Sequence, residues 1–228
     1  MVGVLGVSAS AILVRFSQAP SGVTAAYRLG WTVLLLLPVV LLRCRAELRR
    51  VTARDLVLCG ASGVLLALHF LTWFESLKRT SVASSTVLVS TEVIFTALGF
   101  ALFLHGKIPR LGVWAILLAF GGSALLALSG GGGAGELSGN LLALAAASAA
   151  AVYTLIGRIQ RGHLSTTVYT FLTYLACFLT LLLGTAAAGT PLTGYGGREW
   201  LIGLALAVLC TLLGHVGWGQ VLEAPAKQ

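Results

Sequence analysis

The sequence has few charged residues, and this scarcity excludes most kinds of soluble protein. Only 10% of the residues are Asp, Glu, Lys or Arg, whereas 57% are hydrophobic and the mean hydropathy is +0.95. A soluble domain carries about 25% charged residues. With so little polar surface, a chain of 228 residues cannot cover a globule that faces water on all sides. Lipid is therefore the expected solvent.

Residues that carry chemistry are also few. The chain has four His and four Cys, together with seven Asp and Glu, and no nucleophile is patterned with a base. Cys44, Cys59, Cys177 and Cys210 lack the paired spacing of a zinc site or a disulfide framework. We therefore predict no catalytic residue, no metal and no cofactor, and an intramembrane enzyme is the least favoured of the alternatives.

What the sequence does have is eight long apolar runs. Backbone amides in hydrocarbon need internal partners, and runs of about 20 residues without alternating polarity fit helices. We predict an all-α, polytopic transmembrane helix bundle of about eight helices, with the lipid bilayer as its partner. The predicted spans are residues 2–17, 23–42, 55–77, 82–104, 111–129, 137–157, 165–188 and 198–222.

The basic residues predict an orientation, because Lys and Arg are retained on the cytoplasmic side. With the N-terminus inside, ten of them are cytoplasmic, namely Arg43, Arg45, Arg49, Arg50, Arg54, Lys107, Arg110, Arg158, Arg161 and Lys227. Four lie outside, namely Arg15, Lys78, Arg79 and Arg198. Their scatter over short loops argues against a nucleic-acid partner despite the net charge of +8. We expect a multi-pass protein of the plasma (inner) membrane with a cytoplasmic N-terminus.

The last three runs echo the first three at an offset of 142 to 146 residues. The matched sets are Thr24, Tyr27, Arg54, Asp55, His69 and Trp73 against Thr166, Tyr169, Arg198, Glu199, His215 and Trp218. A five-helix unit returns to the membrane inverted, and the loop after the seventh run has one Arg where its counterpart has five. We predict an inverted repeat with an incomplete second copy and a solute path near the midplane. Its parts are residues 1–129, a Gly-rich linker 130–136, a partial second repeat 137–222 and a polar tail 223–228.

Polar residues inside the spans carry the functional prediction, since an ionisable one costs about 2.5–3.5 kcal/mol at a helix centre. Glu92, near the middle of the fourth span, has two readings. It is either a neutral acid bonded to nearby hydroxyls or a proton-titrating or cation-contacting group in the transport path. His69 is expected at a similar depth, because the short loop 78–81 makes its span an antiparallel neighbour. It either contacts Glu92 or bonds a backbone carbonyl across a helix interface.

Other candidate residues lie toward the outer surface. Arg28 and Glu75 form a structural ion pair or interfacial anchors, and if they face the cavity they bind the charged ends of a zwitterion. Tyr27 and Trp73 are interfacial or packing residues, or they stack on a hydrophobic solute. His215 in the eighth span completes the set of predicted substrate-binding or coupling residues.

Short motifs resemble those of one transporter family. In order they are Ala25-Ala-Tyr-Arg28, the stretch Ser76–Thr86, Gly139-Asn140, Ile156-Gly-Arg158 and Leu213-Gly-His215. Together they resemble the EamA-type family of the drug/metabolite transporter superfamily over nearly the whole chain. The resemblance implies two inverted five-helix repeats and transport of metabolites, amino acids or drugs, often coupled to an ion gradient. The chain departs from the family at Val93, where a proline is usual, at His105–Lys107, and in lacking helices nine and ten.

We therefore expect a secondary membrane transporter that moves a small organic solute across the plasma membrane by alternating access. Glu92 is the expected coupling or binding group, with a proton or another ion as its partner, and His69 and Trp73 line the cavity. The alternative is a non-transporting truncated membrane protein or an assembly subunit that needs a partner chain. Assembly as a homo-oligomer stays open.

Overall fold

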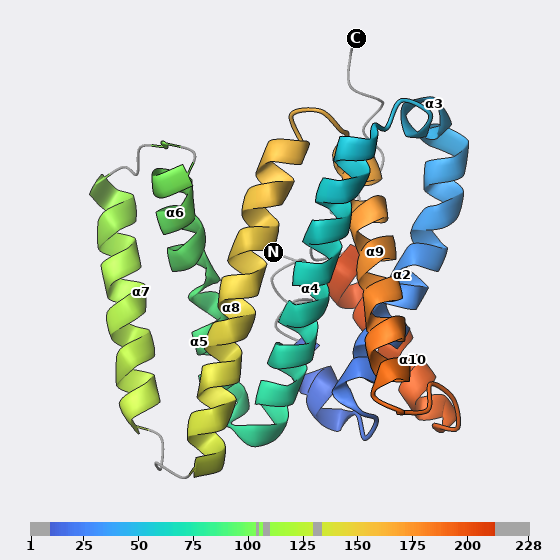
Figure 1. Ribbon diagram of the computed structural model, residues 1–228. Helices are drawn as coiled ribbons and strands as arrows, with labels where there is room; N and C mark the ends of the chain where they lie inside the picture. Colours follow the sequence, from blue (N-terminus) through green and yellow to red (C-terminus); the bar gives the residue numbers. More distant parts are fainter. Residues whose placement is uncertain (1–9, 104, 107–109, 130–133, 213–228) are drawn as a thin grey trace. The chain divides into compact units, whose positions relative to one another are not determined.

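The computed structural model describes residues 10–103, 105–106, 110–129 and 134–212, and the regular elements within them are helices (Figure 1). They are α2 (Ser21–Arg43), α3 (Arg45–Leu48), α4 (Ala53–Arg79), α5 (Val82–Ser90), α6 (Glu92–Phe103), α7 (Arg110–Ser129), α8 (Ala134–Gln160), α9 (Thr166–Ala187), α10 (Gly197–Ala205) and the π-helix η1 (Leu206–Leu212). Residues 10–16 are helical as well. The predicted polar tail 223–228 lies outside the described residues, and only residues 134–136 of the predicted linker are described, as the first turn of α8.

Among the described residues, five helical segments are long and apolar enough to cross a membrane. These are Ser21–Arg43, Ala53–Arg79, Val82–Phe103, Glu136–Gln160 and Thr166–Ala187. Arg110–Gly122 is a shorter apolar helix within α7. Each of these lies within a few residues of a predicted span, so the prediction of an all-α, polytopic membrane bundle is confirmed.

Serine side chains begin two of the spans. The Ser81 Oγ accepts the Ser84 amide at 3.0 Å ahead of α5, and the Ser165 Oγ accepts the Val168 amide at 3.3 Å ahead of α9. Such caps satisfy amides that the first turn of a helix leaves without partners. The Ser165 amide itself donates to Glu47 Oε1 of α3 at 2.6 Å, so this short helix after α2 is bonded to the start of α9.

Contacts divide the chain into two compact units. The first unit comprises residues 1–67 and 156–228, and the second comprises residues 68–155. In the first unit, α2 packs against both α9 and α10. In the second unit, the end of α4 is bonded to the start of α8, where the Thr80 Oγ1 donates to Asn140 Oδ1 at 3.0 Å. The predicted division into a first repeat, residues 1–129, and a second repeat, residues 137–222, is based on the sequence echo and not on contacts. It stays a prediction.

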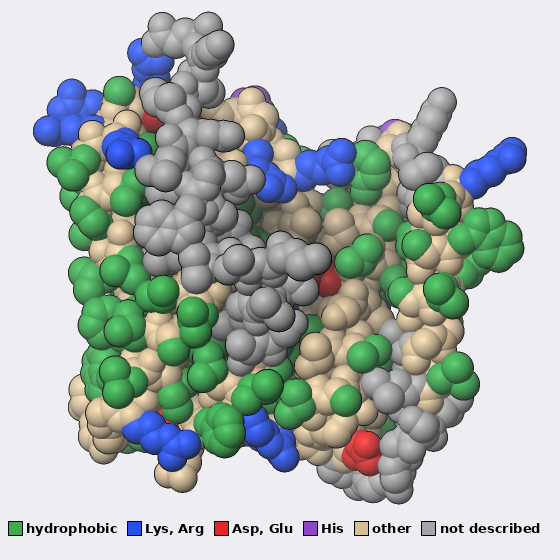
Figure 2. Space-filling view, turned by 180° about the vertical axis from the view of Figure 1, so that it is seen from behind, with side chains coloured by type: hydrophobic (Ala, Val, Ile, Leu, Met, Phe, Trp, Pro, Cys, Tyr) green, Lys and Arg blue, Asp and Glu red, His purple; other side chains and the backbone are tan. Residues whose placement is uncertain are grey.

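The surface of the helices is apolar over their middle parts. Figure 2 shows hydrophobic side chains between the helix ends and Lys and Arg side chains near those ends. Leu42, Leu118 and Leu183 are 84%, 80% and 72% exposed. Leucine side chains this exposed are stable when they face lipid rather than water.

Candidate functional site

Glu92 lies at an interruption of the fourth span. The sequence predicts one helix over residues 82–104, whereas the structure has α5 up to Ser90 and α6 from Glu92, with Thr91 between them. Within Val82–Phe103, Glu92 is ten residues from the first residue and eleven from the last, so it sits at the centre of the span. Interrupted helices near the midplane mark the binding sites of many transporters.

Hydroxyl groups bond the backbone carbonyls around this interruption. The Ser90 Oγ donates to the Thr86 carbonyl at 2.7 Å, and the Thr91 Oγ1 donates to the Leu88 carbonyl at 2.6 Å. Serine and threonine bonded back to a preceding carbonyl favour bending of a helix. The local sequence Ser90-Thr91-Glu92 therefore accounts for the break without a proline.

The carboxylate of Glu92 is bonded across to the next span. Thr154 of α8 donates from its Oγ1 to Glu92 Oε1 at 2.8 Å, and both residues are half-buried in the second unit. A hydroxyl partner lowers the cost of placing a carboxyl group in the membrane interior. The arrangement positions an ionisable group at the middle of a span, where it can exchange a proton or contact a cation or an amine.

His69 and Trp73 form part of an aromatic cluster on α4. Their rings stack with centroids 5.8 Å apart, and Phe70 and Phe74 pack against them. The His69 Nδ1 lies 3.0 Å from the Ala146 carbonyl of α8, which is the backbone contact foreseen as the alternative to Glu92. The indole nitrogen of Trp73 is buried and has no hydrogen-bond partner among the described residues.

The structure does not bring His69 and Glu92 together. Ala146 and Thr154, their respective partners, are eight residues apart on α8, which is about 12 Å along its axis. The expectation of a shared depth assumed one straight helix from residue 82 to residue 104. Counting residues from the loop 78–81 therefore did not predict which positions of α8 the two side chains contact.

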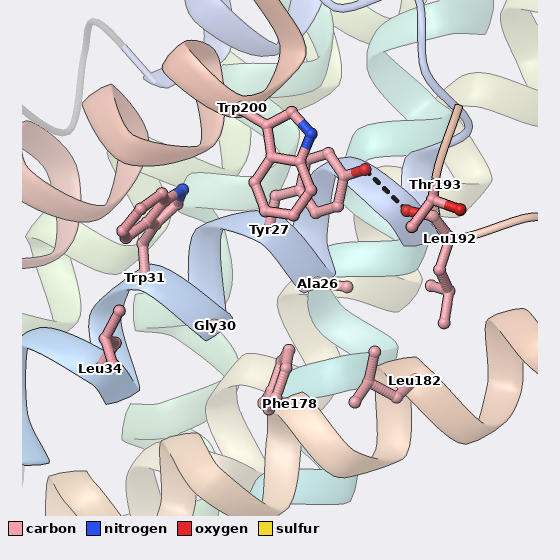
Figure 3. Close-up of a pocket in the computed structure, with 10 residues that line it drawn as sticks. All are labelled: Ala26, Tyr27, Gly30, Trp31, Leu34, Phe178, Leu182, Leu192, Thr193 and Trp200. Atoms are coloured by element: carbon pink, nitrogen blue, oxygen red, sulfur yellow. Dashed lines mark hydrogen bonds between the residues drawn. The ribbon is translucent and has the colours of Figure 1, made fainter. Parts of the chain in front are cut away.

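Tyr27 lies in the first unit and lines a cavity there. Its ring stacks on Trp200 of α10 with centroids 4.1 Å apart, and its hydroxyl donates to the Leu192 carbonyl at 2.7 Å (Figure 3). Trp31 meets Trp200 edge-on with centroids 6.5 Å apart. Trp31 and Trp200 are not among the residues predicted from the sequence. An aromatic residue three positions into α10 is a typical interfacial signal, but it does not reveal which helix the ring will contact.

The remaining predicted residues are spread over the chain. Arg28 is 2% exposed and belongs to the first unit, whereas Glu75 belongs to the second. Glu75 Oε1 accepts from Arg79 Nη2 at 2.9 Å in an exposed pair one helical turn apart, which is an interfacial ion pair of small energy. The pairing of Arg28 with Glu75 stays a prediction, and His215 lies outside the described residues. No group of His, Cys, Asp and Glu in the described ranges is arranged to hold a metal ion.

Two acidic side chains of the first unit make matching contacts. Glu199, in the first turn of α10 and 7% exposed, accepts from the Ser17 Oγ at 2.6 Å and from the Gln18 amide at 3.1 Å. Asp55, in the first turn of α4, accepts from Gln160 Nε2 at 3.2 Å. Asp55 and Glu199 are counterparts in the sequence echo. Each predicted copy thus has its third span bonded to the segment that precedes the second span of the other copy.

The tyrosines of the echo show the same exchange of contacts. Tyr27 of α2 packs on α10, and an added Cβ at Gly203 of α10 would lie 2.7 Å from the Tyr27 Cβ. Tyr169 of α9 bonds Ser62 of α4, with 2.6 Å between the two hydroxyl oxygens. Two copies related by a two-fold axis make reciprocal contacts of this kind.

Known proteins resemble this chain in sequence profile and in fold. The sequence profile of the EamA-like transporter family matches residues 1–128. One solved structure, described only as the crystal structure of a protein, matches with a TM-score of 0.61 and 21% identity, covering 96% of this chain and 75% of that chain. At this identity the likeness shows the fold alone. No match was found among curated proteins.

Proposed function

Since this chain belongs to the EamA-like transporter family, we propose that it carries a small organic solute, such as a metabolite, an amino acid or a drug, across the plasma membrane. The family places it among the multi-pass membrane transporters of the drug/metabolite superfamily. The proposed mechanism is alternating access with the N-terminus in the cytoplasm, and the proposed coupling ion is a proton.

The observation that carries this proposal is the position of Glu92. An ionisable group at the centre of a span costs free energy, and functional membrane proteins place such groups on solute or ion pathways. Here the group also adjoins the interruption of its helix at Thr91, and transporters commonly place their binding sites beside such interruptions. Glu92 is therefore the proposed binding and coupling group, and Thr154 is the residue that positions it.

The reciprocal contacts of the first unit support the inverted repeat. Asp55 meets Gln160, and Glu199 meets Ser17 and Gln18, so neither predicted copy is packed only on itself. In the proposed orientation, the first contact lies toward the cytoplasm and the second toward the outside. Copies arranged in this way enclose a route between them, and rocking of one copy against the other opens it to each side in turn.

The other predicted residues have proposed roles beside Glu92. His69 and Trp73 offer a stacking surface to an apolar or aromatic part of the solute. Arg28 is buried and charged, and in the proposal it neutralises an anionic group of a zwitterionic solute. Glu75 is proposed to lie along the outer part of the route. Tyr27, whose ring stacks on Trp200 and whose hydroxyl donates to the Leu192 carbonyl, is proposed to be a packing residue.

Reconstitution into liposomes tests the role of Glu92. Uptake of a panel of amino acids and drugs is measured with and without a pH gradient for the full chain and for Glu92→Gln. We expect Glu92→Gln to abolish the pH-dependent part of the flux, because glutamine has the same shape but does not titrate in this range. Glu136→Gln, the same change in the first turn of α8, is the matched control and keeps its flux.

A second pair of variants tests the hydrogen bond. Thr154→Val removes the donor to Glu92, and we expect a loss of about 2- to 10-fold in flux, the equivalent of one hydrogen bond. Ser148→Ala removes a hydroxyl from the same helix whose partner among the described residues is the Leu144 carbonyl at 3.0 Å, so its flux stays unchanged. Normal flux and pH dependence in Glu92→Gln would discard the coupling role. If neither the full chain nor any variant carries flux, the result would favour the alternative that this protein is an assembly subunit.

A further inference from the structure

The first unit contains a cavity of about 350 Å³ between α2, α9 and α10 (Figure 3). Its lining residues are Ala26, Tyr27, Gly30, Trp31, Leu34, Phe178, Leu182, Leu192, Thr193 and Trp200. Glu92, His69 and Trp73 belong to the second unit, and none of them lines this cavity. A cavity of this size is at the lower end of the range of small-molecule sites.

The cavity extends along the depth of one membrane leaflet. Ala26 and Leu34 lie five and thirteen residues from the start of α2, which is about 7 and 20 Å along the helix. On α9, Leu182 and Phe178 lie five and nine residues before its last residue, or about 7 and 13 Å from that end. Half of a bilayer hydrocarbon core is about 15 Å. The cavity therefore runs from the level of the helix ends toward the midplane.

The wall of the cavity suits an apolar ligand. Its lining includes four aromatic rings and no charged side chain. The Tyr27 hydroxyl is already bonded to the Leu192 carbonyl, which leaves the indole N–H groups of Trp31 and Trp200 and the Thr193 hydroxyl as the polar side-chain groups of the lining. Three such groups are too few to replace the water around a charged or hydroxyl-rich solute.

The cavity is closed on one side and open toward lipid on the other. Ala26 and Tyr27 are 1% and 7% exposed, whereas Leu34 and Trp200 at the rim are 55% and 42% exposed. Leu34 lies inside a helix that is long and apolar enough to cross a membrane, so we expect acyl chains to be the molecules next to this rim. Arg198, exposed and two residues before Trp200, puts a positive charge near the level of the lipid phosphates while its Nη2 donates to the Phe16 carbonyl at 3.0 Å.

We propose that this cavity binds one acyl chain of a bilayer lipid. The chain lies along α2 from the interface toward the midplane and contacts three helices and the loop before α10 at once. The lipid phosphate lies near Arg198. A ligand that binds only the folded protein raises its stability, so this lipid is a structural component of the first unit.

Lipids with brominated acyl chains test the proposal, because bromine quenches tryptophan fluorescence on contact. Leu182→Phe narrows the cavity, while Leu183→Phe makes the same change at the next position of α9, which is 72% exposed. The full chain and both variants are titrated in detergent micelles with brominated phosphatidylcholine. We expect a saturable quenching component in the full chain and in Leu183→Phe, reduced roughly two-fold or more in Leu182→Phe because Trp31 and Trp200 form part of the wall.

Native mass spectrometry of the same three proteins gives an independent readout. We expect one retained lipid on the full chain and on Leu183→Phe, and none on Leu182→Phe. Equal quenching and equal lipid retention in both variants would overturn the proposal, since the lipid would then be annular. Displacement of a fluorescent apolar solute such as 1-naphthol, without any retained lipid, would also overturn it in favour of a solute site. Transport activity is not needed for either readout.

Discussion

Replacement of Gly63 by alanine measures how closely α4 and α9 pack. The added Cβ would lie 2.5 Å from the Ala176 Cβ, and 2.7 Å from both the Thr173 carbonyl oxygen and the Cys177 amide nitrogen. Ordinary contact begins at 3.4 Å, so the helices must move apart by up to about 1 Å. Two of the three atoms are backbone, so a change of side-chain rotamer cannot relieve the clash.

Gly60, one turn earlier on α4, is the matched control. An added Cβ there meets nothing within 4 Å. Both substitutions gain about 1 kcal/mol of helix propensity, so the difference between the two variants isolates the clash at Gly63. Because overpacking costs about 1–3 kcal/mol, we expect Gly63→Ala to be less stable than Gly60→Ala by that amount.

Thermal unfolding in one detergent, followed by tryptophan fluorescence, measures the difference. One kcal/mol corresponds to about 2–4 °C for a chain of this size, so we expect midpoints about 2–12 °C apart. Titration with SDS checks the order of stability under conditions where refolding can be followed. Adding Ala176→Gly to Gly63→Ala should restore only part of the loss, since the two backbone contacts remain. Equal midpoints for Gly63→Ala and Gly60→Ala would refute the close approach of these helices.

Two further predictions concern the ends of the helices. Glu199→Gln keeps the shape of the side chain but removes the charge that accepts hydrogen bonds from Ser17 and Gln18. We expect the free energy of unfolding, measured by the same thermal assay, to fall by about 1–2 kcal/mol, and Glu136→Gln to leave it unchanged. A change below about 0.3 kcal/mol in Glu199→Gln contradicts a charge-assisted bond. Burial and, secondarily, the nearby Glu47 raise the pKa of the Cys44 thiol despite Arg43. Since the thiolate is the reactive form, labelling of Cys44 by a membrane-impermeant maleimide should be slow at neutral pH and still rise above pH 8.5, the ordinary thiol pKa. With Cys44→Ser as background, labelling only in inside-out vesicles supports the proposed orientation, and labelling in intact cells contradicts it.

The helical class of the protein could be predicted because composition alone constrains it. A chain with 10% charged residues and long apolar runs cannot form a water-soluble fold. In hydrocarbon the backbone is restricted to structures whose amides and carbonyls bond one another. The capping serines Ser81 and Ser165 act over three residues, so the starts of α5 and α9 are local properties of the sequence as well.

The candidate site was predictable only in part. The central position of Glu92 follows from counting along its span, because hydropathy sets the ends of that span. Its partner Thr154 is 62 residues away, and hydropathy carries no information on which polar side chains meet. The break at Thr91 was missed because the hydroxyls of Ser90 and Thr91 bend a helix through bonds to carbonyls, which leave the apolar pattern unchanged.

The amino-acid sequence by itself determined that this chain is a bundle of membrane helices with an acidic residue at the centre of one span, because both features depend on residue type and on order along a single segment. Only the tertiary structure decided three contacts: the His69 ring lies against the Ala146 carbonyl, Glu199 accepts a hydrogen bond from Ser17, and the Trp200 ring stacks on Tyr27. These contacts join segments between 77 and 182 residues apart, and they depend on the rotation of each helix about its axis. Packing fixes that rotation, since lipid presents the same solvent to every apolar face.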